Sequence, residues 1–238
     1  MRAEIVTLFP EMVQAVLDAS ILGRAREAGR LATTITNLRE FGLGRYRRVD
    51  DAPYGGGPGM IFRPEPVFAA VETVLARVAE PCRLILPSPQ GRPFTQSLAA
   101  ELAAEARPLL FLCGHYEGID ERILQGFAFE EVSLGDFVLT GGELPMLAML
   151  DAAARLLPGV LGNADSAGAD CFSEAVDGRL KYPQYTRPAV FRGMAVPDVL
   201  RSGHHLEIER WQRAEAARAT REKRPDLLAG PDAGSAGG

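Results

Sequence analysis

The chain has few cysteines, no long apolar run and no common phosphate-binding fingerprint, and each absence excludes a class of protein. Its three cysteines, Cys82, Cys113 and Cys171, form no CxxC pair among 238 residues. Such an odd and scattered set argues against a disulfide framework or a zinc site and favours a reducing cytoplasm. No apolar run approaches the ~20 residues of a membrane span, and the amino-terminal segment lacks the apolar core of a signal peptide. We therefore expect a cytoplasmic protein that does not enter a membrane.

The missing phosphate fingerprints concern two glycine loops in the middle of the chain. The apolar run Leu109 to Cys113 leads into Gly-His-Tyr-Glu-Gly at 114–118, and the run 132–139 ends at Thr140-Gly141-Gly142. Neither loop contains G-x-G-x-x-G or G-x-x-x-x-G-K-[ST], which argues against a nucleotide-binding oxidoreductase. Two strands that end in glycine loops are typical of a ligand crevice at the carboxyl edge of an α/β sheet. The alternative is that each loop is only a tight turn.

Apolar strand patterns alternate with helical patterns along most of the chain, which predicts a parallel sheet covered on both faces. The length allows one sizeable α/β domain and one smaller domain. We expect the large domain at 1–161, a flexible Gly- and Ala-rich linker at 162–172 and a small, mainly helical domain at 173–229. The tail at 230–238 is expected to be disordered.

Capping and breaking residues predict where several elements begin and end. Ser20 is expected to cap the second helix, and Thr95 is expected to cap a helix that runs to about Ala106. The sequence PSPQGRPF at 87–94 predicts a turn after a buried strand. The apolar run at 132–139 predicts another strand, interrupted by Gly and Asp at 135–136.

The net charge of −5 does not indicate a nucleic-acid binder, so the distribution of charge matters more than the sum. Four arginines lie between Arg39 and Arg48, directly before Asp50 and Asp51. They belong to an irregular segment, 39–64, which is longer than ordinary loops and is therefore a functional candidate. The aspartate pair is one possible metal site, but no third ligand clusters with it. Positioning of a bulky anionic substrate agrees better with the arginines.

Four segments, taken in order, resemble one enzyme family. They are YGGGPGM at 54–60, PSPQGR at 87–92, GHYEG at 114–118 and TGGELP at 140–145, and the likeness extends from Ile5 to about Leu228. Together they closely resemble the bacterial tRNA (guanine-N1)-methyltransferase family, TrmD, of the SPOUT class.

The resemblance implies an α/β fold whose parallel sheet contains a deep trefoil knot, with the chain around 84–142 threaded through itself. It further implies a homodimer with active sites at the subunit interface and a small domain that binds tRNA. The implied activity is methyl transfer from S-adenosylmethionine to N1 of the guanine immediately 3′ of the anticodon.

The resemblance also implies roles for particular residues. Asp170, in Asp170-Cys171-Phe172, matches the general base, and Arg155 matches the cation that stabilises charge on the guanine O6. From the residues alone, an arginine near a helix end is favoured by the helix dipole, and an aspartate in a polar linker is usually solvated. On the substrate side the candidates are Asp50 as a reader of the base edge, Gly59 in the glycine segment, and His205.

The matching cofactor positions lie in the segment at 87–92, in the loop at 114–118 and in the run from 134 to 141. Backbone amides, and glycines without a Cβ atom, allow close approach to a ligand there. Glu117 is a candidate to face the sulfonium, or a magnesium ion, which the family implies as a further cofactor. His115 and Phe137 differ from the Arg and Tyr of other members. The full set of cofactor candidates is Pro89, Gly114, Glu117, Leu134, Gly135, Asp136, Phe137, Val138, Leu139 and Gly141.

Some interpretations stay open on sequence alone. His204 and His205 could act on a metal or a proton, although adjacent histidines point apart, which favours a helix cap and a tRNA-facing surface. Trp211 is expected to pack the small domain, with base stacking as the alternative. Another SPOUT methyltransferase, acting on rRNA or a different tRNA position, would have the same fold and cofactor. A non-catalytic RNA-binding module would not need all three cofactor loops.

Overall fold

The computed structural model describes residues 1–162, 170–173 and 176–228. The chain divides into two compact units, Met1–Gly162 and Asn163–Gly238, which are considered separately below. The expected tail at 230–238 and most of the expected linker lie outside the described residues. In the described part, no helix is both long and apolar enough to cross a membrane.

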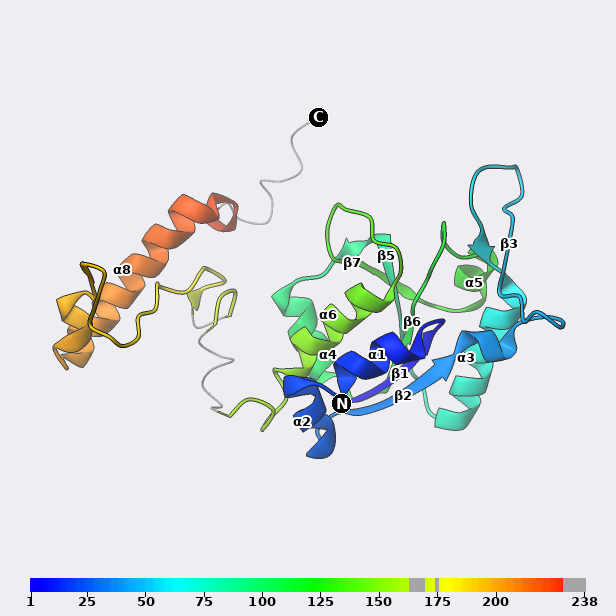
Figure 1. The fold of residues 1–238 in the computed structure, drawn as a ribbon, viewed down its shortest axis with the longest axis horizontal. Coiled ribbons are helices and arrows are strands. Elements are labelled where there is room, and N and C mark those ends of the chain that lie inside the picture. The colour runs from blue at the N-terminus through cyan, green and yellow to red at the C-terminus, as the bar shows by residue number, and fades with distance from the viewer. Residues whose placement is uncertain (163–169, 174–175, 229–238) are drawn as a thin grey trace. The chain divides into compact units, whose positions relative to one another are not determined.

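The first unit is built on a parallel sheet of five strands, as the alternation of patterns predicts (Figure 1). The strand order is β2-β1-β6-β5-β7, and every neighbouring pair is parallel. All five carboxyl ends therefore meet at one edge of the sheet. The strands are β1 (Arg2–Thr7), β2 (Ala32–Asn37), β5 (Arg83–Pro93), β6 (Leu109–Leu112) and β7 (Glu130–Ser133).

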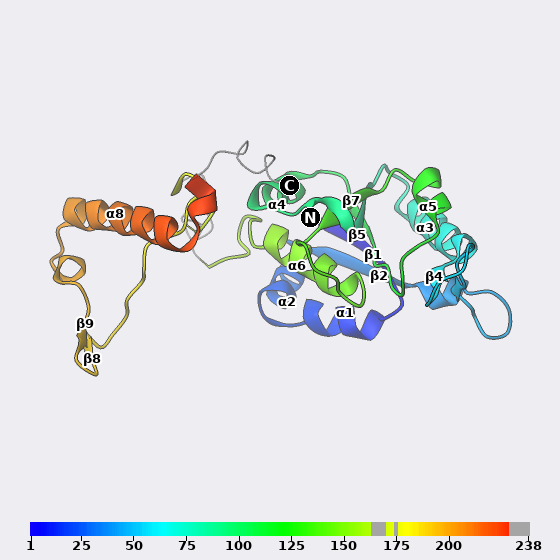
Figure 2. The same cartoon turned by 90° about the horizontal axis from the view of Figure 1, so that it is seen from above.

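Helices lie on both faces of this sheet (Figure 2), and a separate apolar cluster lies between the sheet and the helices on each face. Successive side chains of a strand point to opposite faces, so Ile5 belongs to one cluster and Val6 to the other. The first cluster packs against α1 (Pro10–Leu17), α2 (Ser20–Glu27), α4 (Gln96–Ala104) and α6 (Glu143–Ala154); the second packs against α3 (Pro64–Val78) and α5 (Glu121–Gly126).

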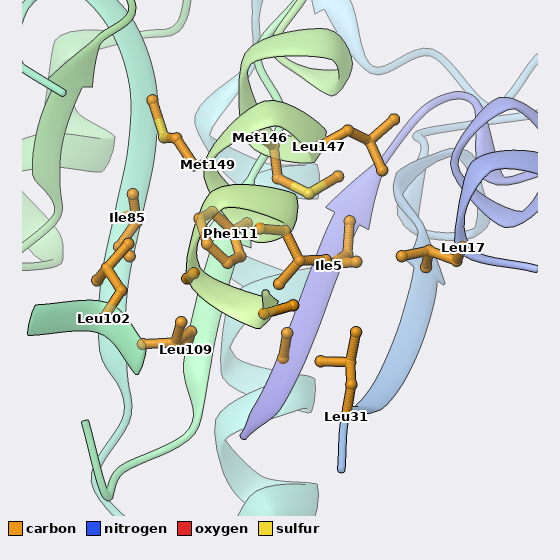
Figure 3. Packing of buried hydrophobic residues seen from close by; sticks show 14 of the residues in the cluster. Ile5, Leu17, Leu31, Ile85, Leu102, Leu109, Phe111, Met146, Leu147 and Met149 are labelled. Carbon is orange, nitrogen blue, oxygen red and sulfur yellow. The ribbon is translucent and has the colours of Figure 1, made fainter. Parts of the chain in front are cut away.

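Helix α6 is the most deeply buried of these helices, and it packs directly against one face of the sheet. Met146, Leu147 and Met149 of this helix lie in the same apolar cluster as Ile5 and Phe111 of the strands (Figure 3). Met146 and Met149 are fully buried. Because burial of such side chains stabilises by about 1.5–3 kcal/mol each, the start of α6 is held firmly below the carboxyl edge of the sheet.

The segment predicted to be irregular, 39–64, contains short ordered pieces. The 3-10 helix η1 (Leu38–Phe41) is followed by a tight hairpin, and β3 (Asp50–Asp51) then pairs antiparallel with β4 (Ile61–Phe62). The glycine segment at 54–60 connects β3 to β4.

Three local predictions were wrong. Ser20 is the first residue of α2 rather than its cap, and the capping position is Ala19, whose side chain has no oxygen to accept a hydrogen bond. The predicted turn at 87–94 is instead the outer half of β5, which continues past a register shift between Pro87 and Arg92.

The third error is the expected strand at 132–139. Strand β7 ends at Ser133, because the Ser133 hydroxyl bonds both the amide and the carbonyl of Gly135, whose φ is +149°. The chain therefore turns away from the sheet at this glycine. Thr95 does cap α4, as predicted, by accepting a hydrogen bond from the Leu98 amide.

The second unit is organised around one long helix, α8 (His205–Lys223). The buried Thr220 hydroxyl on this helix accepts a hydrogen bond from the Leu180 amide, 3.1 Å away. Trp211 lies against the Tyr185 ring, which agrees with a packing role. The remaining elements are β8 (Val190–Phe191), β9 (Met194–Ala195), η3 (Asp198–Arg201) and η4 (Pro225–Leu228).

Candidate functional site

A pocket of about 300 Å³ lies at the carboxyl edge of the sheet, where the segments that follow β6 and β7 meet the outer part of β5. This is the place where open α/β sheets bind ligands. Asp136, in contrast to the other predicted cofactor positions, lies outside the pocket lining. The nine that line it are Pro89, Gly114, Glu117, Leu134, Gly135, Phe137, Val138, Leu139 and Gly141.

Glycines allow two of these loops to touch. The Gly142 amide donates a 2.8 Å hydrogen bond to the Gly114 carbonyl, and His115 pairs with Gly141 as an isolated bridge. A Cβ at Gly142 would lie only 2.8 Å from the Gly114 nitrogen. A Cβ at Gly141 would lie 2.5 Å from Glu143 Oε2 and 2.8 Å from His115 Nδ1. The contact between the loops therefore requires glycine at both positions.

A buried hydrogen bond supports this glycine turn from below. The Thr7 hydroxyl at the end of β1 donates to Glu143 Oε1 over 2.7 Å, and both side chains are buried. The same hydroxyl accepts the Phe9 amide. Burial, and then the charge of Glu143, raise the pKa of the Cys113 thiol. The sequence analysis gave Glu143 no role beyond its place in TGGELP; an acidic residue directly after Gly-Gly was the available signal.

The glycine segment at 54–60 reaches the same pocket. Gly59 has a φ of +81°, and a Cβ there would lie 2.7 Å from Glu117 Oε1. The Glu117 amide also donates to the Met60 carbonyl at 3.0 Å. The structure thus brings a predicted substrate residue, Gly59, against a predicted cofactor residue, Glu117.

Asp50 lies near Tyr116, and Tyr116 is one of the residues that line the pocket. Asp50 is paired with Phe62 across the β3–β4 ladder, and the Phe62 ring meets the Tyr116 ring edge-on at 5.7 Å. Burial and the Asp50 charge raise the pKa of the Tyr116 phenol, while the Arg39 guanidinium lowers it. Asp50 therefore lies near the pocket rim, and its contact with a bound base stays a prediction.

The two predicted catalytic residues belong to different units. Arg155 is the half-buried C-cap residue of α6 in the first unit. Asp170 belongs to the second unit, where Lys181 Nζ lies 3.6 Å from Asp170 Oδ1. Two backbone amides also hold this segment, since Lys181 donates to Cys171 Sγ and Phe172 donates to the Arg179 carbonyl.

The histidines of the second unit lie at the start of α8. His205 is exposed and is the first helical residue, and His204 occupies the capping position without a capping bond from its side chain. Among the residues that the structure describes, no group of three or more His, Cys, Asp or Glu side chains could hold a metal ion. Asp51, one of the acidic pair, instead forms an ion pair with Arg63. Magnesium binding stays a prediction.

Comparison with known proteins agrees with this geometry. The sequence model of the family "tRNA (Guanine-1)-methyltransferase TrmD" matches residues 1–230. The chain belongs to the TrmD family.

Curated TrmD relatives resemble it along nearly their whole length. A tRNA (guanine-N(1)-)-methyltransferase of Anaeromyxobacter sp. (strain K) is 55% identical over 229 residues, which cover 96% of this chain and 91% of the relative. Proteins of the same name from Gloeobacter violaceus and Halalkalibacterium halodurans are 54% and 52% identical, and cover 96% and 97% of this chain and 98% and 92% of the relatives. Three of the four segments identified in the sequence, at 87–92, 114–118 and 140–145, contribute residues to the pocket lining, and the fourth, at 54–60, contacts the lining residue Glu117.

Proposed function

We propose that the protein transfers a methyl group from S-adenosylmethionine to N1 of the guanine immediately 3′ of the anticodon in tRNA. The observation that carries the proposal is the pocket itself. In a chain of the TrmD family, the glycine loops close around one cavity at the carboxyl edge of a parallel sheet. The basic segment before Asp50 supports an anionic substrate.

The residues around the pocket fit S-adenosylmethionine. Its volume lies at the lower end of the range for ligand pockets, and a Cβ at Gly141 would fill part of the loop contact that shapes it. His115 Nδ1 is buried without a hydrogen-bond partner among the described residues. Backbone groups of Gly114, of 134–139 and of Gly141 would hold the cofactor, and the Glu117 carboxylate would face its positive charge. When bound, the cofactor supplies an electrophilic methyl group.

Methylation of N1 requires removal of its proton, for which Asp170 is the proposed base. Negative charge then develops on the neighbouring O6, where the Arg155 guanidinium would stabilise it. Asp50 and Gly59 would position the guanine, and His205 would contact the tRNA. Within the second unit, Lys181 Nζ lies 3.6 Å from Asp170 Oδ1 and the Lys181 amide bonds the neighbouring Cys171, which supports a carboxylate of fixed position.

A homodimer is part of the proposal. Apolar side chains are exposed on α1 and on the pocket loop, and the Phe9 ring meets the His115 ring at 5.0 Å, which links the two regions. Exposed apolar patches of this kind mark protein–protein contacts, and a second copy of the chain is the proposed partner. The exposed residues are Phe9, Met12, Val16, Val138, Leu139 and Leu144.

The SPOUT trefoil knot, spanning about 84–142, and the domain roles are proposed on the same basis. The hydrogen bond from Gly142 to Gly114 supports an interlocked chain, because the segment after β7 returns to the loop after β6. We assign 1–161 to cofactor binding, 162–172 to the linker and 173–229 to tRNA binding, in the cytoplasm.

The decisive experiment incubates the protein with labelled S-adenosylmethionine and, in parallel, unmodified tRNA transcripts or unmodified rRNA, and maps the methylated base. Label on N1 of the guanine 3′ of the anticodon is the expected result. Label at another tRNA position, or only in rRNA, would replace the proposed substrate with the alternative one. A protein that binds these RNAs without transferring label would contradict a methyltransferase.

A further inference from the structure

An arginine-bearing hairpin, residues 42–48, projects from the first unit between η1 and β3. Leu43 and Arg48 exchange two backbone hydrogen bonds of 2.8 and 3.0 Å, which close the hairpin. Gly44 and Arg47 both have positive φ, as a tight turn requires. Gly42 packs against the Arg47 backbone so closely that no Cβ could be added. The hairpin is therefore a defined structure, which the sequence pattern did not reveal.

The arginines of the hairpin are exposed and lack acidic partners. Arg45, Arg47 and Arg48 form no ion pair with a carboxylate in the part of the chain that the structure describes. Nearby arginines behave differently, since Arg63 pairs with two carboxylates and Arg122 with one. Three unneutralised cations on one short hairpin produce a local positive potential despite the acidic chain.

An aromatic ring accompanies these charges. Tyr46, at the tip, is 76% exposed, and the Arg45 guanidinium lies 6.0 Å from its ring centroid. A large exposed aromatic side chain among arginines is a common arrangement for stacking on an unpaired base.

The hairpin leads along the chain into Asp50, which lies beside the candidate site. Arg48 is followed by the buried Val49 and then by Asp50, whose neighbour Tyr116 lines the pocket. A guanine held at this rim has its sugar and phosphates outside the pocket. The flanking nucleotides would then extend toward the hairpin, which ends two residues before Asp50.

We propose that the hairpin grips the RNA strand next to the target guanine, with Arg45 and Arg48 on phosphates and Tyr46 stacked on a neighbouring base. The inference rests on the proposed function and adds a contact outside the pocket. Phosphate contacts contribute affinity that decreases with salt, whereas stacking depends little on salt. The two contributions can therefore be separated by experiment.

The charge contribution is tested with the double variant Arg45→Gln/Arg48→Gln, leaving Arg47 and its strained backbone unchanged. Binding of an unmodified tRNA transcript is measured from low to high salt. We expect roughly tenfold weaker binding near 0.1 M salt and a salt slope smaller by about 1–2. The matched control is Arg24→Gln/Arg30→Gln, which removes two exposed arginines before β2, at the opposite end of the strand from the hairpin. It should bind like the wild type.

The stacking contribution is tested with Tyr46→Ala and Tyr46→Phe. The alanine variant should bind about tenfold more weakly with an unchanged salt slope, and the phenylalanine variant should retain wild-type affinity. Because all these side chains are exposed, melting temperatures should stay constant.

Hairpin variants with wild-type affinity and salt slope would overturn the inference, as would an equal loss in the Arg24/Arg30 control. These outcomes are distinct from failure of the proposed function. If the wild-type protein methylates tRNA and the hairpin variants bind normally, only the hairpin assignment is wrong. If the wild-type protein does not methylate tRNA, the proposed function itself is wrong.

Discussion

Gly141 leaves no room for a side chain, and we expect Gly141→Val to abolish S-adenosylmethionine binding. The first added atom would already meet Glu143 Oε2 and His115 Nδ1, so the loop must shift away from the pocket. Isothermal calorimetry measures the affinity, and circular dichroism checks the fold. Gly162→Val is the matched control, because nothing lies within 4 Å of a Cβ there, and it should bind normally. Normal affinity in folded Gly141→Val would make the turn purely structural.

At the same scale, Asp170→Asn should abolish methyl transfer while leaving cofactor affinity largely unchanged. The amide keeps the shape of the carboxylate but cannot accept the N1 proton. Asp177→Asn changes another aspartate of the same unit, exposed and outside the proposed site, and should keep full activity. The assay follows labelled methyl groups into tRNA. Substantial turnover by Asp170→Asn would remove this residue from the mechanism.

Functional residues were easiest to predict where they belong to a sequence motif. They were hardest to predict where their role depends on a contact with a residue far away in the sequence. The glycine loops identified positions that the structure gathers at one pocket. The bond between Thr7 and Glu143 joins residues 136 positions apart, and no local pattern reports such a contact. For Asp170, composition favoured a solvated linker residue, whereas the structure holds it against Lys181. Its catalytic role stays a prediction.

At the scale of elements, Arg83 at the start of β5 connects three neighbours. Its side chain is 10% exposed, and its guanidinium lies within 4.0 Å of Glu101 on α4, Glu105 after α4 and Glu130 on β7. Arg83→Met would remove the cation that these three carboxylates share and leave them only the more exposed Arg92 and Arg107. We expect the free energy of unfolding to decrease by about 2 kcal/mol.

Urea unfolding measures this loss. The comparison is Arg122→Met, whose guanidinium is 62% exposed and pairs with Asp120 at the start of α5. An exposed pair of this kind contributes about 1 kcal/mol at most. Equal effects of the two substitutions would show that Arg83 does not join the elements around it.

Most helices and strands of the first unit were predictable because burial imposes a period on the sequence. Leu109 to Leu112 is apolar throughout, as a strand covered on both faces must be. The outer half of β5 escaped prediction, because its side chains are largely exposed and its pairing with β7 depends on the partner strand. The hairpin at 42–48 is held by hydrogen bonds between backbone groups. Such bonds impose no periodic pattern of apolar residues that a sequence could reveal.

At the scale of the whole molecule, the periodicity of apolar residues predicts the layers of helices and sheet, but not whether the chain passes through itself in a knot. A knotted and an unknotted parallel sheet bury the same alternating residues, so the proposed knot depends on family resemblance and on the contact between the loops after β6 and β7. The same limit applies to assembly. The exposed apolar side chains of α1 and the pocket loop indicate a partner surface, but they do not say which subunit supplies the base.

We expect each active site to be shared between two subunits. The cofactor loops belong to the first unit, while Asp170 belongs to the second, after the linker. In the proposed dimer, Asp170 of one subunit would act on a guanine held at the cofactor pocket of the other. Co-expression of two inactive variants, Asp170→Ala and Gly141→Val, distinguishes this arrangement from a site within one subunit.

If the base acts in trans, a hybrid dimer contains one site with both lesions and one site with neither. Random pairing makes half of the dimers hybrid, so the mixture should recover about a quarter of wild-type activity. If Asp170 serves its own subunit, every site carries one lesion and the mixture stays inactive. Differently tagged subunits allow the hybrid to be purified, in which case the expected activity rises to about half of wild type. An inactive purified hybrid, folded and dimeric, would exclude the shared site.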